Sequence, residues 1–443
     1  MKRFCVVLLL LGLIAAFRTP AMAVDVKFSG EYYAAGMYLD KTNLTKSSTG
    51  GNPSTAFYFQ RLRVKTDFVV SPGLTLTTRA DIMERAWGAV RSSATSTTLD
   101  TGSAGTKAEN ENIAIDWAYL TYKAPVGIFS VGYMNDGATG TIFGNSSAPA
   151  ARIKYGKSFG PATLNLAYTK VNGGENSTRN GVAGFSDVDN DKYGIEGVYT
   201  WKDGKAGLNV NYYNYASNRP ASDNRSTYFL ITPYATAKIG PVALQAELNY
   251  ATGKQKYEAP STSADIDLQG ISGWVDATAD FGKFYVGGSV AYVSGNDPGT
   301  TDKKEDQSVT GGIDWDPCLI MFNGDRSYWA GNLAGYTGTT ANGNAFNNGY
   351  FAQLRGGVRP AEKFDIMASL SWAYADKTPS GTWEGRNYGY EIDVTGTYKI
   401  TNNLSYMLGA GYWMVGDYYK GTTSINHDLT DNFMVINKLT LTF

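Results

Sequence analysis

The last stretch of the chain, TDNFMVINKLTLTF from Thr430 to Phe443, decides the fold. Within it, Leu439, Leu441 and Phe443 fall on one side of an extended backbone, and the polar residues between them fall on the other. This alternation with a period of two is typical of a β-strand with one apolar and one polar face. An unpaired apolar edge promotes aggregation in water, which disfavours the alternative of an edge strand in a soluble β-sandwich. The pattern is satisfied if this strand pairs with the first one, closes the sheet and turns its apolar face to lipid.

The other end of the chain is typical of an exported protein. Two basic residues precede an apolar run from Phe4 to Phe17, and a small-x-small pattern ends at Ala23. The run of about 14 residues is shorter than the about 20 residues that a helix needs to cross a bilayer. We therefore predict that residues 1–23 are a cleaved secretory signal peptide and that residues 24–443 form one mature domain.

The composition also favours a membrane-embedded sheet. The chain holds 51 Gly, 31 Tyr and 9 Trp, its aromatic share is 13% and its charged share is 18%. Tyr and Trp prefer the boundary between lipid and water, because their rings are apolar and their polar tips need hydrogen bonds. A net charge of −1 gives no indication of nucleic-acid binding. Cys318 is the one cysteine after the predicted signal, so no intrachain disulfide is expected, and no motif for a cofactor is found.

The stretch from Phe57 to Val70 shows most clearly which face of the sheet is in contact with water. Charged residues alternate here with apolar ones and with Thr; the charged set is Arg61, Arg63, Lys65 and Asp67. In lipid only the apolar set can face outward, so the charged set must face an aqueous lumen. In the following strand, Glu84 falls on the outward parity near the strand end, where it would reach lipid head groups.

Short turns and long polar segments alternate along the whole chain. Short turns are predicted at 71–73, 124–127, 160–161, 202–204, 240–241, 282–283, 360–362 and 401–403. One strand up and one strand down for each turn gives an all-β chain with roughly 18 antiparallel strands, or roughly 16 or 20 in alternative counts. The uncertain region is Asn296 to Asn348. Val309–Trp315 and Cys318–Phe322 could add a hairpin, but Pro317 lacks a ladder donor, so we expect this region to fold into or over the mouth instead.

These features together resemble the porins and porin-like channels of Gram-negative outer membranes: a signal, alternating strands, short turns, long loops and a terminal Phe. The segment WDPCLI from Trp315 to Ile320 is also similar to a stretch of alginate-export-like barrels. The resemblance implies a multi-pass barrel in the bacterial outer membrane, in contact with lipid and lipopolysaccharide and exported through the periplasm. It implies passive diffusion of small hydrophilic or charged solutes and ions, no cofactor and no enzymatic activity. A homotrimer is left open, because trimer-facing and lipid-facing strands have the same composition.

The candidate functional residues are the charges on lumen parity, where they would set the selectivity of a pore. The basic set is Arg61, Arg63, Lys65, Arg79, Arg85, Arg152, Lys154, Arg355 and Arg359. The acidic set is Asp67, Asp81, Asp116, Glu247, Asp276, Asp280, Asp365, Glu391 and Asp393. A basic wall opposite an acidic wall would create a transverse field that favours polar solutes. The alternative is that these charges pair with one another and simply line a wet wall.

A second candidate is the segment from Asp136 to Ala150, which includes Phe143 and Asn145. Its position corresponds by count to the third loop of the general porins, which in that family folds inward and narrows the lumen. The acidic motif of the family is missing, since Asp136 is the one charge in the segment. An ordinary external loop is the alternative.

Four other interpretations of the sequence have weaker support. Asp187, Asp189 and Asp191 alternate like the start of a Ca²⁺ loop but lack its glycine and its final Glu. His427 beside Asp428 has no supporting catalytic motif, so an enzyme is not expected. A substrate-specific saccharide channel would need aromatic residues along the lumen, and Tyr213, Tyr215, Trp274 and Trp413 have that parity. A barrel that sheathes a periplasmic partner, such as an electron carrier, is the remaining alternative.

Overall fold

The computed structural model describes residues 24–46, 51–88, 113–137, 140–173, 188–217, 224–258, 261–341, 345–422 and 427–443. The predicted signal peptide lies outside these residues. Eighteen antiparallel strands form a closed barrel. They are β1 (Asp25–Leu39), β2 (Thr55–Ser71), β3 (Leu74–Ala86), β4 (Ile113–Ala124), β5 (Gly127–Asn135), β6 (Pro149–Phe159), β7 (Ala162–Asn172), β8 (Asn190–Trp201), β9 (Gly204–Tyr215), β10 (Asn224–Ile239), β11 (Val242–Tyr257), β12 (Ile266–Asp280), β13 (Phe284–Val293), β17 (Gly349–Ala361), β18 (Phe364–Ala375), β19 (Asn387–Lys399), β20 (Leu404–Val415) and β21 (Asn432–Thr442).

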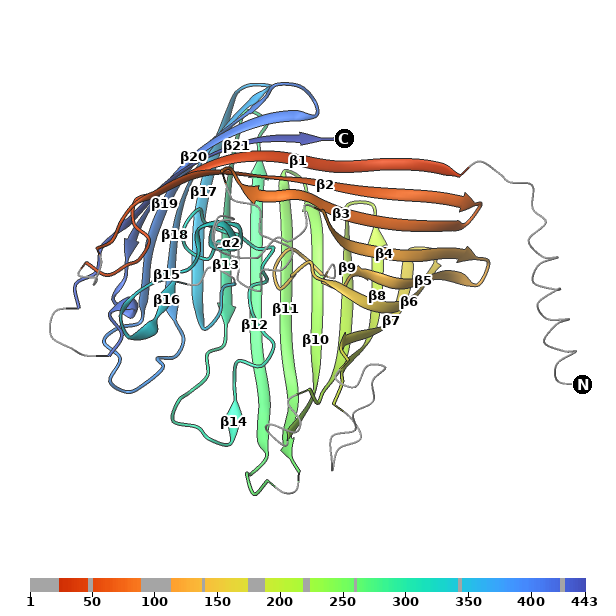
Figure 1. Ribbon diagram of the computed structural model, residues 1–443, viewed down its shortest axis with the longest axis horizontal. Coiled ribbons are helices and arrows are strands. Elements are labelled where there is room, and N and C mark those ends of the chain that lie inside the picture. The colour runs from red at the N-terminus through yellow and green to blue at the C-terminus, as the bar shows by residue number, and fades with distance from the viewer. Residues whose placement is uncertain are drawn as a thin grey trace, which may run out of the picture.

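The barrel closes between its last strand and its first, as the terminal alternation predicts. β21 pairs antiparallel with β1, from Glu31 opposite Thr442 to Leu39 opposite Met434. Two hydrogen bonds finish the seam, from the Gly30 amide to the Phe443 carbonyl at 2.8 Å and from the Phe443 amide to the Gly30 carbonyl at 3.1 Å. Figure 1 shows β1 and β21 side by side. No apolar edge strand is therefore left open at this seam.

The strands are joined by short turns at one end and long segments at the other. The turns are two to four residues long, for example 72–73 between β2 and β3 and 400–403 between β19 and β20. The longest described connection, from β13 to β17, spans residues 294–348. It carries the short strands β14 (Lys303–Lys304), β15 (Leu333–Ala334) and β16 (Thr340–Ala341), the helix α2 (Gly324–Ala330) and the 3₁₀ turn η1 (Tyr336–Gly338). A second 3₁₀ turn, η2 (Asp417–Lys420), follows β20. The alternative wall hairpin within 309–322 is wrong, because these residues lie inside the barrel.

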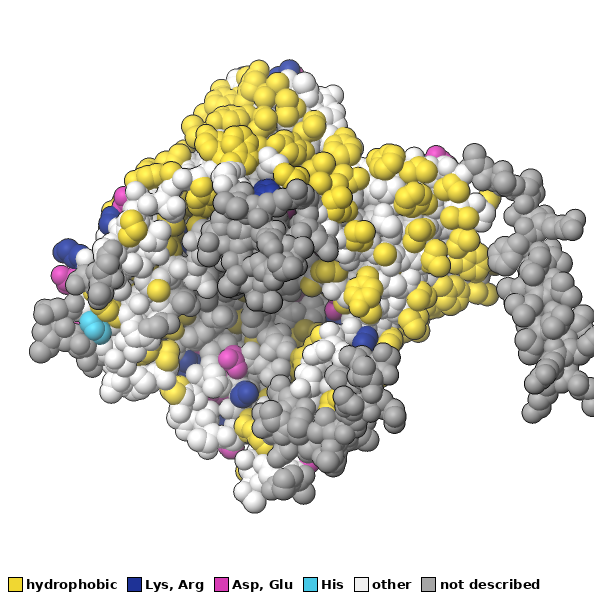
Figure 2. Space-filling model, viewed as in Figure 1, with side chains coloured by type: hydrophobic (Ala, Val, Ile, Leu, Met, Phe, Trp, Pro, Cys, Tyr) yellow, Lys and Arg dark blue, Asp and Glu magenta, His cyan; other side chains and the backbone are white. Residues whose placement is uncertain are grey.

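The two faces of the wall differ in polarity as lipid on one side and water on the other require. On β19, Tyr390, Ile392, Val394 and Tyr398 are each 44–47% exposed on the outside, whereas the residues between them face inward. Tyr390 and Tyr398 are eight residues apart, ~27 Å along the strand. That span is close to the about 25 Å of the apolar band that aromatic girdles flank in membrane barrels. Figure 2 shows hydrophobic side chains gathered over the outer wall. None of the described helices is both long and apolar enough to cross a membrane.

A bulge near the end of β3 changes the predicted position of two residues. Met83 has a φ of 52°, and Gln60 pairs with Arg85 while Leu62 pairs with Ile82, so Met83 and Glu84 together oppose one residue of β2. Glu84 is therefore turned inward, and the prediction that it faces lipid head groups is wrong. Arg85 is placed opposite Gln60, on the outward parity, instead of on the lumen wall. A bulge shifts the alternation by one residue, which the parity pattern alone does not reveal.

Candidate functional site

The segment 294–348 fills one side of the lumen with an apolar core. Trp315, Phe322 and Trp329 are at most 5% exposed and pack against inward-facing residues of the wall. Trp329 on α2 stacks on Phe59 of β2, with ring centroids 4.4 Å apart. Trp315 packs edge-to-face against Phe351 of β17 at 5.2 Å. The buried wall residues come from β11–β13, β17–β21, β1 and β2, so this sector of the barrel is closed by packed side chains.

Carboxylates of β19 hold this segment against the wall. The fully buried Glu391 accepts hydrogen bonds from the amides of Ile320 and Met321, each at 2.6 Å. Asp393, two residues along the strand, accepts from the amide of Leu319 at 3.3 Å. Both residues have the predicted lumen parity, but they bind backbone and do not line a water-filled passage. Their function in the structure is therefore to anchor the segment.

The segment 136–150 also turns into the lumen. Phe143 is fully buried; its ring stacks on Trp274 of β12 at 5.7 Å and meets Trp315 edge-to-face at 5.2 Å. The segment leaves β5 and returns to β6, so this contact carries it across the barrel interior to β12. An inward loop, and not an ordinary external one, is thus what the structure contains.

The two inward segments are fastened to each other. Asp314 accepts hydrogen bonds from the amide and the hydroxyl of Ser147, at 3.0 and 2.6 Å. Its own amide donates to the carbonyl of Asn145 at 3.1 Å, and the Ile313 amide donates to the Ser146 hydroxyl at 2.9 Å. Residues more than 160 positions apart in sequence therefore form one continuous structure inside the barrel.

The predicted basic patch lies on the lumen wall of β2 and β3, and its members are paired with acids. Arg63 makes a bidentate contact with Asp81 at 2.6 and 2.5 Å, and Arg79 donates to Asp116 at 2.7 Å. The patch also contains ion pairs of Arg61 with Glu31 and Glu84, at 3.7 and 3.4 Å, of Arg63 with Asp116 at 3.9 Å, and of Lys65 with Asp67 at 2.7 Å. Pairing lowers the net field of the patch, but several of these side chains stay accessible to water.

Arg355 and Arg359 lie on β17 and are also paired. Arg355 makes a bidentate contact with Asp276 at 2.7 and 2.8 Å. Arg359 contacts Asp280 at 2.9 Å and Asp365 at 3.1 Å, beside the short turn between β12 and β13. The two arginines thus lie within the lumen wall at different heights, each with carboxylates of neighbouring strands.

A small polar recess of about 80 Å³ opens on the inner face of β5–β9. Its charged lining residues are Asp136, Arg152, Lys154, Lys192 and Glu196, and asparagines complete it. Arg152 and Lys192 both pair with Asp136. Lys154 has no ion-pair partner within the described part of the chain, so three cations face two carboxylates in the recess.

Sequence reasoning missed Lys192 and Glu196, although both lie on the inward parity of β8. Lys192 is 9% exposed, and Glu196 accepts hydrogen bonds from Tyr234 at 2.7 Å and from Asn165 at 2.9 Å. The signal that would have found them is the alternation with Tyr193 and the other outward residues of β8.

The residues of the weaker candidate sites have structural partners. Lys170 contacts both Asp189 and Asp191, so a lysine ammonium already lies where a Ca²⁺ ion would; Asp187 lies outside the described residues. His427 stacks on Tyr336 at 4.2 Å, and its Nδ1 lies 2.7 Å from the Lys420 carbonyl oxygen.

The predicted aromatic track is divided between two environments. Trp274 and Trp413 are 4% and 0% exposed within the apolar core, where a passing solute cannot reach them. Tyr213 and Tyr215 lie on β9, and Tyr213 stacks on Tyr228 of β10 at 4.6 Å. The lumen therefore has no continuous aromatic path through these four positions.

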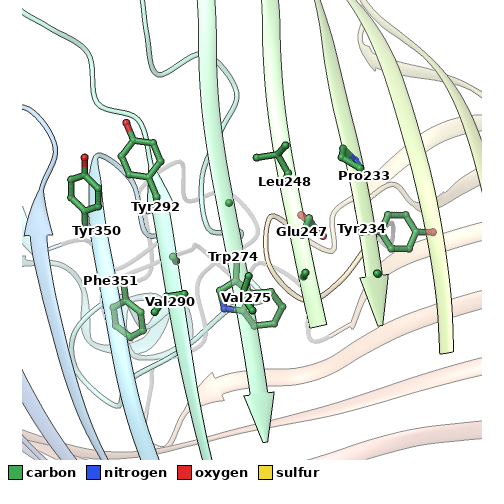
Figure 3. Close-up of a pocket in the computed structure, with 14 residues that line it drawn as sticks. Pro233, Tyr234, Glu247, Leu248, Trp274, Val275, Val290, Tyr292, Tyr350 and Phe351 are labelled. Carbon is green, nitrogen blue, oxygen red and sulfur yellow. The ribbon is translucent and has the colours of Figure 1, made fainter. Parts of the chain in front are cut away.

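The outer wall also has a concave region. A groove of about 830 Å³ lies over β10–β13 and β17 (Figure 3). Its exposed lining is apolar and includes Pro233, Leu248, Val275, Val290 and Tyr350. These residues have the outward parity, so the groove faces the lipid side.

Solved structures share this architecture. The outer membrane protein OpdK from Pseudomonas aeruginosa superposes with a TM-score of 0.52 and 12% identity, over 94% of this chain and 99% of that one. This chain has the fold of an outer-membrane channel. OccK9 (OpdG) from the same organism matches with a TM-score of 0.51 and 13% identity over 95% and 99% of the two chains. A variant of OccD1 (OprD) matches with a TM-score of 0.50 and 10% identity over 96% and 97%. No protein-family model and no curated protein matches the sequence.

The barrel fold and the contacts inside it together define the shape of the lumen. The wall has the fold of an outer-membrane β-barrel. Two inward segments close the apolar sector of its lumen, and charged side chains line the remaining sector.

Proposed function

We propose that this protein is an outer-membrane diffusion channel whose path for small hydrophilic or charged solutes and ions lies off the barrel axis. The path runs along the inner face of β2–β9, beside the two inward segments. One observation carries the proposal: charged side chains on the inner face of β2 keep partial exposure to water beside the two inward segments.

Side chains on the inner face of β2 differ in exposure from buried inward residues of the opposite wall. The side chains of Arg63, Lys65 and Asp67 are 30%, 37% and 27% exposed, although all three point into the barrel. On the opposite wall, inward-facing Ser371 and Trp413 are completely buried, and comparable exposure is found at Arg359 and Asp365 near the short turns, each 35% exposed. Because a residue on the inner face gains exposure only from space in the lumen, the exposure of Arg63, Lys65 and Asp67 supports a path that passes beside β2.

The packing inside the barrel favours the passage of small solutes over the enclosure of a partner protein. A barrel that sheathes a periplasmic electron carrier would need most of its interior free. Here α2 and the Trp315 region already pack against the wall, and Asp314 joins them to the second inward segment. The space beside this structure suits single hydrated solutes.

A substrate-specific channel is the second candidate, and the recess on β5–β9 favours it. Lys154 lacks an ion partner among the described residues, and its neighbours Asn165, Asn209 and Asn211 offer amide donors and acceptors. Such a niche would retain a small anion or a hydroxylated solute during passage. Selectivity would then come from binding as well as from size.

Swelling of proteoliposomes tests the proposal. The refolded mature protein should admit an uncharged pentose faster than a disaccharide, and swelling no faster than that of protein-free liposomes would overturn it. The swelling rates with small carboxylates, with ammonium compounds of matched size and with the pentose then distinguish a general diffusion channel from a substrate-specific one. Lys154→Ala should slow the carboxylates selectively in a substrate-specific channel, whereas Lys202→Ala in a short turn is the matched control.

A further inference from the structure

One cluster of metal-ligating side chains is left unexplained by diffusion. Cys318 of the inward segment meets Glu391 and Asp393 of β19, and one ligand atom from each residue lies within 4.8 Å of the other two. Their exposed fractions are 4%, 0% and 3%. The three residues come together although 73 and 75 positions separate Cys318 from Glu391 and Asp393 in the sequence.

The cluster has an unused ligand atom. Oδ1 of Asp393 is buried and has no hydrogen-bond partner, whereas Oδ2 accepts from the Leu319 amide. A Cβ built on Gly411 would lie 2.6 Å from this Oδ1 and 3.4 Å from Oε1 of Glu391, which places oxygens of both acids on the same side of the strand pair. A buried carboxylate oxygen without a donor is costly unless a proton or a cation satisfies it.

The surroundings provide little positive charge. Among the described residues no Lys, Arg or His forms an ion pair with Glu391 or Asp393. The fully buried Arg326 interacts electrostatically with Glu391, but it forms no ion pair with it and donates to the carbonyls of Ile320 and Gly331, at 3.1 and 2.8 Å. Two adjacent carboxyl groups in a water-excluded site therefore need either a proton or a further cation.

We propose that Cys318, Glu391 and Asp393 bind a divalent transition metal of the Zn²⁺ class, which fastens the inward segment 294–348 to the barrel wall. Thiolate with carboxylate is a donor set for this class, whereas Ca²⁺ and Mg²⁺ take oxygen ligands alone. Ligand atoms around tetrahedral Zn²⁺ are ~3.5 Å apart, given bonds of about 2.0–2.3 Å. The ligands therefore need to move inward by about 1 Å, and Cys318, which lies outside the wall strands, is the residue that can move.

Binding would exchange protons for the metal. An ordinary cysteine thiol has a pKa of about 8.5, so the metal-free thiol carries its proton at neutral pH. That proton is released when the thiolate–metal bond forms, and affinity should rise with pH. The alternative occupant is a proton shared between the two carboxyl groups, which leaves the thiol uninvolved.

Cobalt is a suitable probe because its thiolate complexes absorb light. The refolded mature protein, treated with a chelator and then dialysed, is titrated with Co²⁺ and followed in the near ultraviolet and visible. We expect a thiolate-to-cobalt charge-transfer band that saturates at one metal per chain. Cys318→Ser should abolish the band and Asp393→Asn should weaken binding at least tenfold. Asp428→Asn, which removes an exposed carboxylate in a loop, should leave both unchanged.

Two results would overturn the proposal: no charge-transfer band in the folded wild-type protein, or a band that persists in Cys318→Ser. X-ray absorption of the zinc-loaded wild-type protein gives a test that needs no variant. One sulfur in the first shell is expected, and a shell of oxygen and nitrogen alone would contradict the site. Because the proposed metal site and the diffusion path are separate, conductance can be present whether or not metal binds.

Discussion

Glu247 on β11 accepts two hydrogen bonds from Thr141 of the inward loop, from its amide at 2.7 Å and from its hydroxyl at 2.8 Å. Asn249 donates to the other oxygen of the same carboxylate at 3.0 Å. Glu247 is 5% exposed, so these contacts satisfy a buried charge and at the same time fix the position of the loop. The acid predicted to line the lumen thus holds the inward loop in place.

Release of this loop should widen the pore. Glu247→Ala removes the Oε2 oxygen that accepts both hydrogen bonds from Thr141, and the loop 136–148 should become mobile enough to raise the mean single-channel conductance about twofold and to add current noise. Glu247→Gln keeps one acceptor for Thr141 and should stay near the wild type. Equal conductance in all three proteins would show that this loop does not limit the current.

Charge changes on β2 and β3 should move ion selectivity in opposite directions. Arg61→Ala together with Arg63→Ala leaves Asp81 and Glu84 without their partners, so the local field becomes negative and the channel should shift toward cations. Asp81→Asn leaves Arg63 uncompensated and should shift it toward anions. Reversal potentials in a salt gradient measure both. A shift of the same sign in the two variants would rule out control by this patch.

The apolar core inside the lumen should contribute to the stability of the barrel. Trp329 is 2% exposed and stacked on Phe59, so Trp329→Ala removes a large buried ring and should lower the free energy of unfolding by about 3–5 kcal/mol. Trp329→Phe retains an aromatic stack and should lose less. Urea unfolding in detergent micelles measures the difference. Unchanged stability of Trp329→Ala would mean that the segment is not packed as described.

Barrel closure depends on a close approach at Gly30. A Cβ at this position would lie 2.2 Å from the Arg63 carbonyl oxygen and 2.9 Å from the Phe443 ring, so Gly30→Ala should reduce the yield of folded barrel. Gly197 on β8 has no atom within 4 Å of such a Cβ, and Gly197→Ala is the matched control. The folded fraction can be read from heat-modifiable migration in gels. Equal yields for both variants would argue against a tight seam.

The wall could be predicted because, in each strand, apolar residues that face lipid alternate with polar residues that face water. The strand predicted at Phe57–Val70, the short turns and the pairing of the last strand with the first are all confirmed, and so is the number of strands. Glu84 and Arg85 were misplaced because the positive φ of Met83 breaks the alternation, and no sequence pattern marks that bulge.

The interior was less predictable because its contacts join distant parts of the chain. The rejection of a wall hairpin at Pro317 followed from its missing amide. The sequence did not indicate that Glu391 would bind the amides of Ile320 and Met321, or that Cys318 would lie beside Asp393. Predicting these contacts would have needed the register of β19 and the path of the inward segment. Parity placed these acids inside the barrel, but it did not indicate what they contact there.

Single-channel conductance of the refolded mature protein in a planar bilayer tests the central claim most directly. The off-centre path predicts stable open steps, smaller than those of an unobstructed barrel of this strand number, with weak dependence on voltage. Correctly folded barrels that insert but give no current steps would contradict an open path beside β2–β9 and would leave the two inward segments as a complete plug.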